Sequence, residues 1–194
     1  MASSAPTGEP AAAANAAAEA DDEILMRRYA TGDTAAFEVL YARHKDPLYR
    51  YLVRGCSDRA LAGELFQDVW MRVIRARKRY RPKARFSVWL YTIAHNRLVD
   101  HYRRDRPSGE MPEMAAPSAD QPAALAERSE RAARLRAALE RLPFEQREAI
   151  LLKEEQDLTI KEIAAVTGVG AETVKSRLRY ALAKLREELP DDRA

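Results

Sequence analysis

Apolar residues recur along most of this chain at the three- and four-residue spacings of α-helices, without a convincing two-residue alternation that would indicate strands. Over residues 24–104 the pattern predicts four helices separated by short breaks, the first of them at Thr31–Asp33. Over residues 129–189 it predicts a second group of helices, interrupted at Pro143 and Gly168. The sequence therefore predicts an all-α protein with two small helical domains, of which the first is a compact N-terminal bundle.

The segments outside these two domains have compositions that cannot form a packed interior. Residues 1–20 hold ten alanines and two prolines but no Leu, Ile, Val or aromatic residue, so we expect residues 1–23 to be a disordered acidic tail. Residues 105–128 contain four prolines and no aromatic residue, which is typical of a flexible linker. Fully extended, such a linker could reach about 80 Å. We therefore expect the two domains to be placed independently.

The formal net charge of +3 hides a strong separation of positive and negative residues along the chain. Residues 1–23 carry five acidic residues and no Lys or Arg, and residues 107–127 carry four acidic residues and no base. Residues 72–106 carry twelve bases and two acids. Such a density of positive charge repels itself unless an anionic partner lies against it, so the block favours a nucleic-acid partner.

Several classes of protein are excluded by composition. The single cysteine, Cys56, rules out a disulfide framework and a cysteine-based zinc site. No apolar run approaches the roughly 18 residues of a membrane span, and the N-terminus lacks the pattern of a secretory signal. There is no glycine-rich nucleotide loop or nucleophile elbow, and His95, Asp100 and His101 do not share one helix face as metal ligands would. We expect a cytoplasmic protein that is not an enzyme and needs no metal or cofactor.

The second domain contains the pattern of a helix-turn-helix. Thr159 and Glu162 form a capping-box pair that begins a short helix, and Gly168 can adopt the positive φ of a tight turn. The helix that follows, from about 171 to 189, has an apolar stripe on one face and polar and basic residues on the other. In DNA-binding proteins such a second helix enters the major groove. The alternative is an ordinary helical hairpin whose basic face is only solvated.

In the first domain, the basic block is interleaved with aromatic residues. Tyr80 and Phe86 flank a stretch that is predicted to be a loop because it contains Pro82. Positive charge beside aromatic rings suits single-stranded nucleic acid, whose phosphates meet the charges while unstacked bases meet the rings. A solvated, basic helix end explains the same composition equally well.

Three segments of the chain resemble motifs of bacterial sigma factors, most of all those of the extracytoplasmic-function (ECF) subfamily. Residues 86–104, FSVWLYTIAHNRLVDHYRR, resemble the promoter-melting segment of that family. Residues 64–73, ELFQDVWMRV, resemble its polymerase-binding helix, and residues 173–178, TVKSRL, resemble its C-terminal DNA-reading helix. The motifs occur in the family's order, with a linker between the domains.

The resemblance implies a partner and a surface for each domain. Residues 24–104 would bind the clamp helices of core RNA polymerase and recognise and melt the −10 promoter element, whereas residues 129–189 would read the −35 element as duplex. The flap of the polymerase is a further implied contact. The polymerase-binding residues would be Glu64, Gln67, Asp68, Met71 and Arg72.

The DNA-binding residues follow from the same resemblance. Contacts to the −10 element, including the melted nontemplate strand, would come from Arg79, Tyr80, Arg81, Lys83, Arg85, Phe86, His95, Asn96, Arg97 and Arg103. Contacts to the −35 element would come from Glu172, Thr173, Lys175, Ser176, Arg177, Arg179 and Tyr180. Anti-sigma proteins are common partners in the subfamily, although the sequence does not reveal one. The competing interpretation is a stand-alone helix-turn-helix regulator, which would bind duplex DNA without polymerase.

Overall fold

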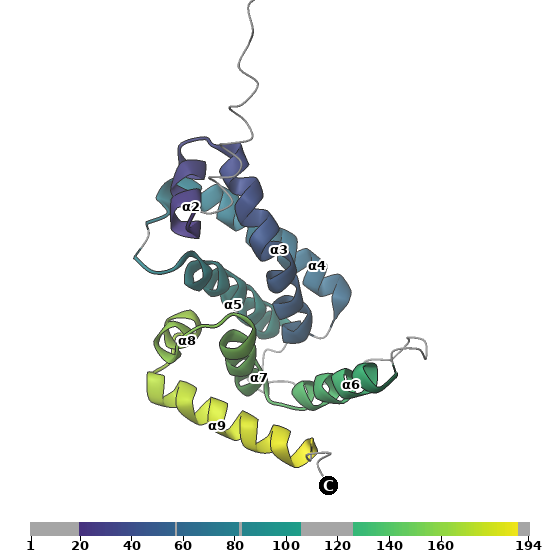
Figure 1. The fold of residues 1–194 in the computed structure, drawn as a ribbon. Helices are drawn as coiled ribbons and strands as arrows, with labels where there is room; N and C mark the ends of the chain where they lie inside the picture. Colours follow the sequence, from purple (N-terminus) through teal and green to yellow (C-terminus); the bar gives the residue numbers. More distant parts are fainter. Residues whose placement is uncertain (1–19, 57, 82, 106–125, 190–194) are drawn as a thin grey trace, which may run out of the picture.

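The computed structural model describes residues 20–56, 58–81, 83–105 and 126–189, and all regular secondary structure in these ranges is helical (Figure 1). In chain order the elements are α2 (Asp22–Ala30), α3 (Thr34–Cys56), α4 (Arg59–Ala76), the short 3-10 helix η1 (Arg77–Arg79), α5 (Phe86–Asp105), α6 (Ala126–Glu140), α7 (Phe144–Ile150), the π-helical segment η3 (Leu151–Glu155), α8 (Ile160–Thr167) and α9 (Ala171–Glu188). The predicted all-α fold is confirmed. No helix in the described ranges is long and apolar enough to cross a membrane.

The N-terminal helices pack in sequence order, α2 on α3, α3 on α4 and α4 on α5. Their facing sides bury aliphatic residues such as Leu40, Leu65 and Leu90, and this burial stabilises the bundle. The predicted break after α2 lies at Gly32, whose φ of 110° favours glycine. Asp33 then begins α3 by accepting a hydrogen bond from the Ala36 amide at 3.1 Å.

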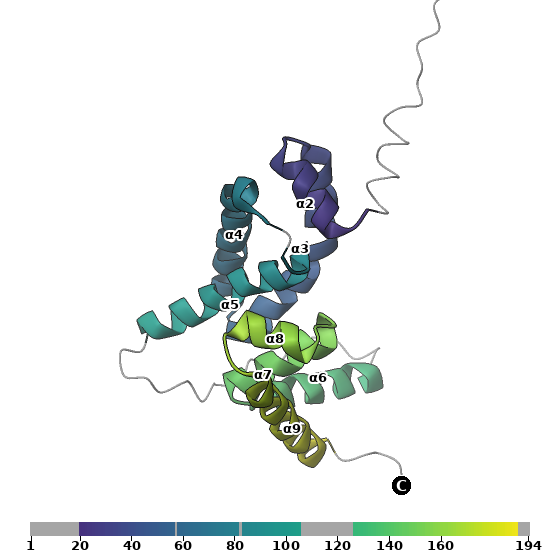
Figure 2. The ribbon, with the colours of Figure 1, turned by 90° about the vertical axis from the view of Figure 1, so that its left-hand side faces the viewer.

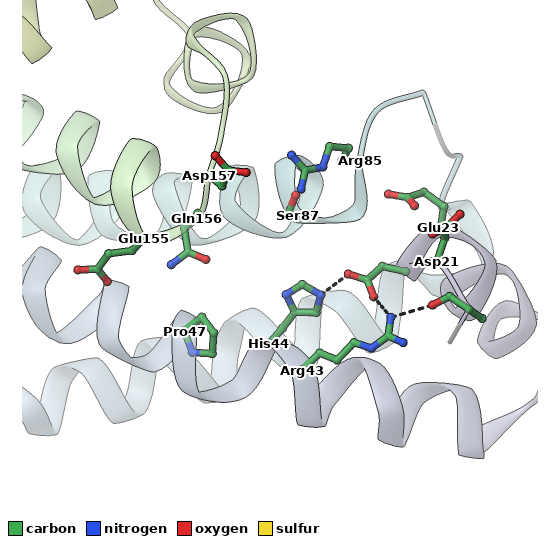
Figure 3. A pocket seen from close by; sticks show the side chains of 12 residues that line it. Asp21, Glu23, Arg43, His44, Pro47, Arg85, Ser87, Glu155, Gln156 and Asp157 are labelled. Atoms are coloured by element: carbon green, nitrogen blue, oxygen red, sulfur yellow. Dashed lines mark hydrogen bonds and ion pairs between the residues drawn. The ribbon is translucent and has the colours of Figure 1, made fainter. Parts of the chain in front are cut away.

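The predicted acidic tail is too long at its C-terminal end. Residues 20–23 belong to the fold, and Arg43 and His44 of α3 bind two of them (Figure 3). Asp22 forms an ion pair with Arg43 and a hydrogen bond with Nε2 of His44, each at 2.5 Å, and the Ala20 carbonyl accepts a hydrogen bond from Arg43. Residues 1–19 lie outside the described residues. Most of the predicted linker, residues 106–125, lies outside them as well, and its last three residues already belong to α6.

The two groups of helices are packed against each other, in contrast to the independent placement that the linker composition suggested. Helix α8 lies along α5, as both views show (Figures 1 and 2). One cluster of buried side chains runs through both groups and includes Leu98 of α5, Phe144 of α7 and Ile163 of α8. The reason is that both helices carry apolar residues on the sides that face each other, which a linker's composition cannot reveal.

Helices α3 and α5 approach closely at Gly55. A Cβ atom at this position would lie 2.7 Å from Cδ1 of Leu98, a side chain that is completely buried. Gly63, inside α4, has open space where its Cβ would be. Among the described residues, two glycines thus lie inside helices, and only Gly55 is required by packing.

We predict opposite effects of alanine at these two glycines on the free energy of unfolding in urea. Gly55→Ala should lower it by about 1 kcal/mol, because overpacking costs about 1–3 kcal/mol and exceeds the gain in helix propensity. Gly63→Ala should raise it by about 0.5–1 kcal/mol, since only the propensity changes. Equal changes at the two positions would contradict the close approach of α3 and α5.

Candidate nucleic-acid interface

The last two helices form the helix-turn-helix that the sequence predicts. Thr159 and Glu162 make both hydrogen bonds of the capping box, the Thr159 amide donating to Glu162 Oε2 at 2.8 Å. Gly168 ends α8 with a φ of 69°, and α9 begins after Gly170. On the inner side of α9, Val174 and Ala181 are completely buried, which fixes the direction of the opposite face.

The outer face of α9 carries the predicted −35 residues. Exposed on it are Glu172, Thr173, Lys175, Arg179 and Tyr180, whereas Ser176 and Arg177 are half-buried. Lys175 pairs with Glu172 at 2.8 Å, and the guanidinium of Arg179 lies 5.0 Å from the centre of the Tyr180 ring. Exposed ion pairs of this kind contribute little stability, so Lys175 can exchange its partner for a phosphate at small cost.

The predicted −10 residues do not all lie at the surface. Exposed are Arg79, Arg81, Lys83, Arg85, Asn96 and Arg103, whereas His95 and Arg97 are half-buried. The side chain of Arg97 is held by ion pairs with Asp68 and Asp100. The exposed bases gather at the end of η1, in the connection to α5 and on α5 itself.

Tyr80 and Phe86, which the resemblance assigned to the −10 element, are buried in the structure. Tyr80 is 6% exposed and Phe86 is fully buried. The Tyr80 ring lies 5.0 Å from Trp89, and the Phe86 ring lies 5.1 Å from His44. Burial raises the pKa of Tyr80 to about 12. Both rings are part of the buried core cluster although their sequence neighbours are charged.

A groove of about 540 Å³ lies between α4 and α5, within the basic part of the first domain. It is lined by Asp68, Arg72, Arg75, Arg79, Trp89 and Asn96, with Ile93 at its side. Trp89, Ile93 and Arg75 are not among the site residues that the sequence predicted. The spacing of 89, 93 and 96 places these three positions on one face of α5 and could have identified the groove.

Asp68 connects the two predicted surfaces of the first domain. Its carboxylate pairs with Arg72 of its own helix at 3.1 Å and with Arg97 of α5. Partial burial by itself raises the pKa of Asp68, but the hydrogen bonds and charges of the two guanidinium groups outweigh it, and the pKa is lowered overall. The carboxylate is therefore ionised at neutral pH and orients both arginines.

The predicted polymerase-binding residues share the outer face of α4. Glu64, Gln67, Met71 and Arg72 are exposed, Met71 by 43%, and Asp68 is half-buried. Leu65, Val69 and Val73 are buried on the inner face. An aromatic extension of this surface was missed by the sequence analysis, because its residues come from two helices. Tyr41 and Tyr49 of α3 lie 6.3 and 5.9 Å from Phe66 of α4 and are partly exposed.

The start of α5 is held by the start of α2. Oε1 of Glu23 accepts a hydrogen bond from the Phe86 amide at 2.5 Å, so that a carboxylate from another helix caps α5. Beside it, a cleft of about 520 Å³ opens between the two domains (Figure 3). Acidic residues of α2, Arg85 and residues 155–157 after α7 line this cleft. Within the described ranges, no group of three His, Cys, Asp or Glu residues is arranged to hold a metal.

Comparison with known proteins identifies both domains. Residues 40–107 match the family "Sigma-70 region 2", and residues 132–185 match the family "Sigma-70, region 4". The two matches together identify the chain as a bacterial sigma factor.

Individual relatives identify the subfamily to which the chain belongs. The chain is 35% identical to the RNA polymerase sigma factor CarQ of Myxococcus xanthus, with 84% of this chain and 95% of CarQ covered. It is 36% identical to the ECF RNA polymerase sigma factor RpoE of Cereibacter sphaeroides, with 81% and 88% covered. The chain belongs to the ECF RNA polymerase sigma factors. Proteins of this family direct RNA polymerase to promoters for transcription initiation and are not enzymes.

Two solved structures share the fold. CnrH in complex with the cytosolic domain of CnrY has a TM-score of 0.65 at 28% identity, covering 88% of this chain and 98% of CnrH. The sigma factor RpoE of Bartonella quintana, in complex with the anti-sigma factor NepR, also has a TM-score of 0.65, at 26% identity. The second comparison covers 81% of this chain and 98% of RpoE.

We predict that removal of the Glu23 carboxylate destabilises the protein. Glu23→Ala should lower the free energy of unfolding in urea by about 1 kcal/mol, because a capping carboxylate is lost. Glu23→Gln should lower it less, since an acceptor oxygen remains. Glu38→Ala, which removes an exposed carboxylate from α3, serves as the control and should change stability little. Equal losses for Glu23→Ala and Glu38→Ala would show that Glu23 does not cap α5.

Proposed function

We propose that this sigma factor uses three surfaces: the outer face of α4 for core RNA polymerase, the α4–α5 groove for the melted −10 strand, and the outer face of α9 for the −35 duplex. The first two adjoin each other at Asp68 and Arg72. The observation that carries this assignment is the two-sided character of α9. Its inner face is buried at Val174 and Ala181, while Lys175 and Arg179 point to the outside, after a glycine turn. This is the geometry with which a recognition helix enters the major groove.

The α4 surface suits a protein partner. It combines Met71 with the partly exposed rings of Tyr41 and Tyr49, surrounded by Glu64 and Gln67. Methionine and tyrosine are enriched at protein interfaces, and a polar rim around them is typical. We assign this face to the clamp helices of the large polymerase subunits, and a contact of region 4 to the polymerase flap.

The groove between α4 and α5 suits a single strand. Arg72, Arg75 and Arg79 supply positive charge for phosphates, and Trp89 supplies an aromatic side for an unstacked base. Flipping a base out of the duplex costs a few kcal/mol, which such contacts must return. The exposed cations Arg81, Lys83, Arg85 and Arg103 extend the positive surface.

The α9 surface suits a duplex. Lys175 and Arg179 can reach phosphates or guanine acceptors, and the carboxylate of Glu172 can accept a hydrogen bond from a cytosine amino group. Thr173, Ser176, Arg177 and Tyr180 complete the set. CnrH and the Bartonella quintana RpoE each have a protein partner in the solved complexes. We propose that this chain too is bound by an anti-sigma protein, and that it acts in the cytoplasm.

Run-off transcription on a pool of genomic fragments tests the proposed function. Core RNA polymerase from the same source is used with and without this protein, and the RNA starts are sequenced. We expect discrete new starts that share two upstream elements. A stand-alone regulator would instead bind duplex DNA in the absence of polymerase, produce no new starts and fail to co-elute with the core enzyme.

We predict that Lys175→Ala weakens promoter binding. On a promoter identified by the run-off experiment, the variant holoenzyme should bind about tenfold more weakly, and the slope of log affinity against log salt should fall by about 1, because one phosphate contact is lost. Arg186→Ala removes an exposed cation near the C-terminal end of the same helix and should leave both quantities unchanged. Equal effects of the two variants would contradict a specific −35 surface at the start of α9.

A further inference from the structure

The connection from η1 to α5 carries exposed cations and places an arginine where a helix cap is expected. Arg81, Lys83 and Arg85 are its exposed cations. Arg85 directly precedes the first residue of α5, at the position where helices prefer Ser, Thr, Asp or Asn as an acceptor for their free amides. A guanidinium has no acceptor, and its charge is unfavourable beside the positive end of the helix dipole. The start of α5 therefore depends on an acceptor from elsewhere in the fold.

Helix α2 supplies this acceptor and is itself anchored on a third helix. Oε1 of Glu23 accepts the hydrogen bond of the Phe86 amide. The preceding residue, Asp22, is bound to Arg43 and His44 of α3. Two adjacent carboxylates at the start of α2 thus bind two different helices, and the contacts with α3 hold Glu23 in place beside α5.

The same helix also contacts the other end of the connection. Helix α2 packs against η1, and the guanidinium of Arg77 in η1 lies 5.6 Å from the centre of the Tyr29 ring of α2. Tyr80, which follows η1, and Phe86, which begins α5, lie edge to face with their ring centres 6.2 Å apart. The two ends of the connection therefore meet in the core, and α2 fixes both of them.

The cap acts on the proposed −10 surface through the first turn of α5. The Trp89 amide donates a hydrogen bond to the Arg85 carbonyl at 3.3 Å, directly beside the capped amide of Phe86. Trp89 is the aromatic side of the α4–α5 groove, and Arg85 belongs to the cations that extend it. Of the described residues that line this groove, none comes from α2. Glu23 can thus influence the groove only through the backbone that it caps.

We propose that Glu23 is a positioning residue for the −10 surface: by capping α5 from α2, it fixes the first turn of α5 and the cations before it in the arrangement that receives the melted strand. This inference rests on the proposed function of the α4–α5 groove. Glu23 and Arg85 line the same cleft, so the charge of Glu23 would by itself repel a phosphate near Arg85. Its effect as a charge and its effect as a cap on strand binding therefore have opposite signs.

The test uses holoenzymes that contain core RNA polymerase and the full chain. Their ligand is a single-stranded oligonucleotide with the nontemplate −10 sequence of a promoter identified by the run-off experiment. Glu23→Ala should weaken its binding about fivefold, because a first turn without its cap is in the binding arrangement for only part of the time. A role of Glu23 as a charge alone predicts tighter binding instead.

Two milder variants separate the cap from the charge. Glu23→Gln removes the charge but keeps an acceptor oxygen at the same place, and it should bind the oligonucleotide within about twofold of the wild type. Glu23→Asp keeps the charge but shortens the side chain by one methylene group, which withdraws the carboxylate from the Phe86 amide. It should weaken binding in the same direction as Glu23→Ala, by a smaller factor.

Asp58→Ala is the matched control for stability. Asp58 caps the start of α4 by accepting hydrogen bonds from the amides of Ala60 and Leu61. The connection to α5 lies beyond the other end of this 18-residue helix, about 27 Å away. Asp58→Ala should lower the free energy of unfolding as Glu23→Ala does, but it should leave binding of the oligonucleotide unchanged. The affinity for core RNA polymerase should be the same for the wild type and all variants.

Three results would overturn the positioning role. They are unchanged or tighter binding by folded Glu23→Ala, an equal loss of binding in Asp58→Ala, and a larger loss for Glu23→Gln than for Glu23→Asp. The last comparison decides the question even where Glu23→Ala fails to fold. A wild-type holoenzyme that does not bind the oligonucleotide would overturn the proposed −10 surface and the positioning role with it, and is thereby distinguished from the other three results.

Discussion

The structure depends on the burial of α5 from two sides at once. Leu90 and Leu98 pack into the N-terminal bundle, and α8 covers the same helix from the other domain. This arrangement produces one continuous buried cluster out of two domains that are joined only by a proline-rich segment. Because α5 also carries positions of the proposed −10 surface, that surface adjoins the packing of the two domains on one helix.

Charge pairing follows the same logic as burial. The basic block of residues 72–106 suggested a surface that binds only nucleic acid. In the structure, several of its arginines instead form ion pairs with acidic residues. Arg97 is held by Asp68 and Asp100, and Arg85 by Glu162. Partly exposed pairs of this type contribute little stability, so the arginine can readily exchange the carboxylate for a phosphate. Glu148 is buried, and removing its hydrogen-bond partners would leave a buried charge without compensation. The exposed arginine–carboxylate pairs are therefore easily broken when a ligand binds, whereas the buried contacts of Glu148 are not.

Local signals in the sequence were sufficient for the helices and for α9. The apolar spacing, the Thr159–Glu162 capping box and Gly168 each act within a few residues, and the structure reproduces their bounds closely. The outer faces of α4 and α9 follow from the same helical period. The sequence did not reveal surroundings that depend on tertiary packing: the burial of Tyr80 and Phe86, the contacts of residues 20–23, and the α4–α5 groove with Trp89.

By itself, then, the sequence determined the class of fold, the helices, the helix-turn-helix and the family, because these depend on periodicity, caps and motifs that are short in sequence. Only the tertiary structure decided that α2 caps α5 through Glu23, that the rings beside the basic loop enter the core, and that the two domains meet around Arg147 and Glu148. The Glu23–Phe86 hydrogen bond joins residues 63 positions apart, and the Tyr51–Glu148 hydrogen bond joins residues 97 positions apart. No local pattern encodes such pairs, since they arise only when whole helix faces are brought together by burial.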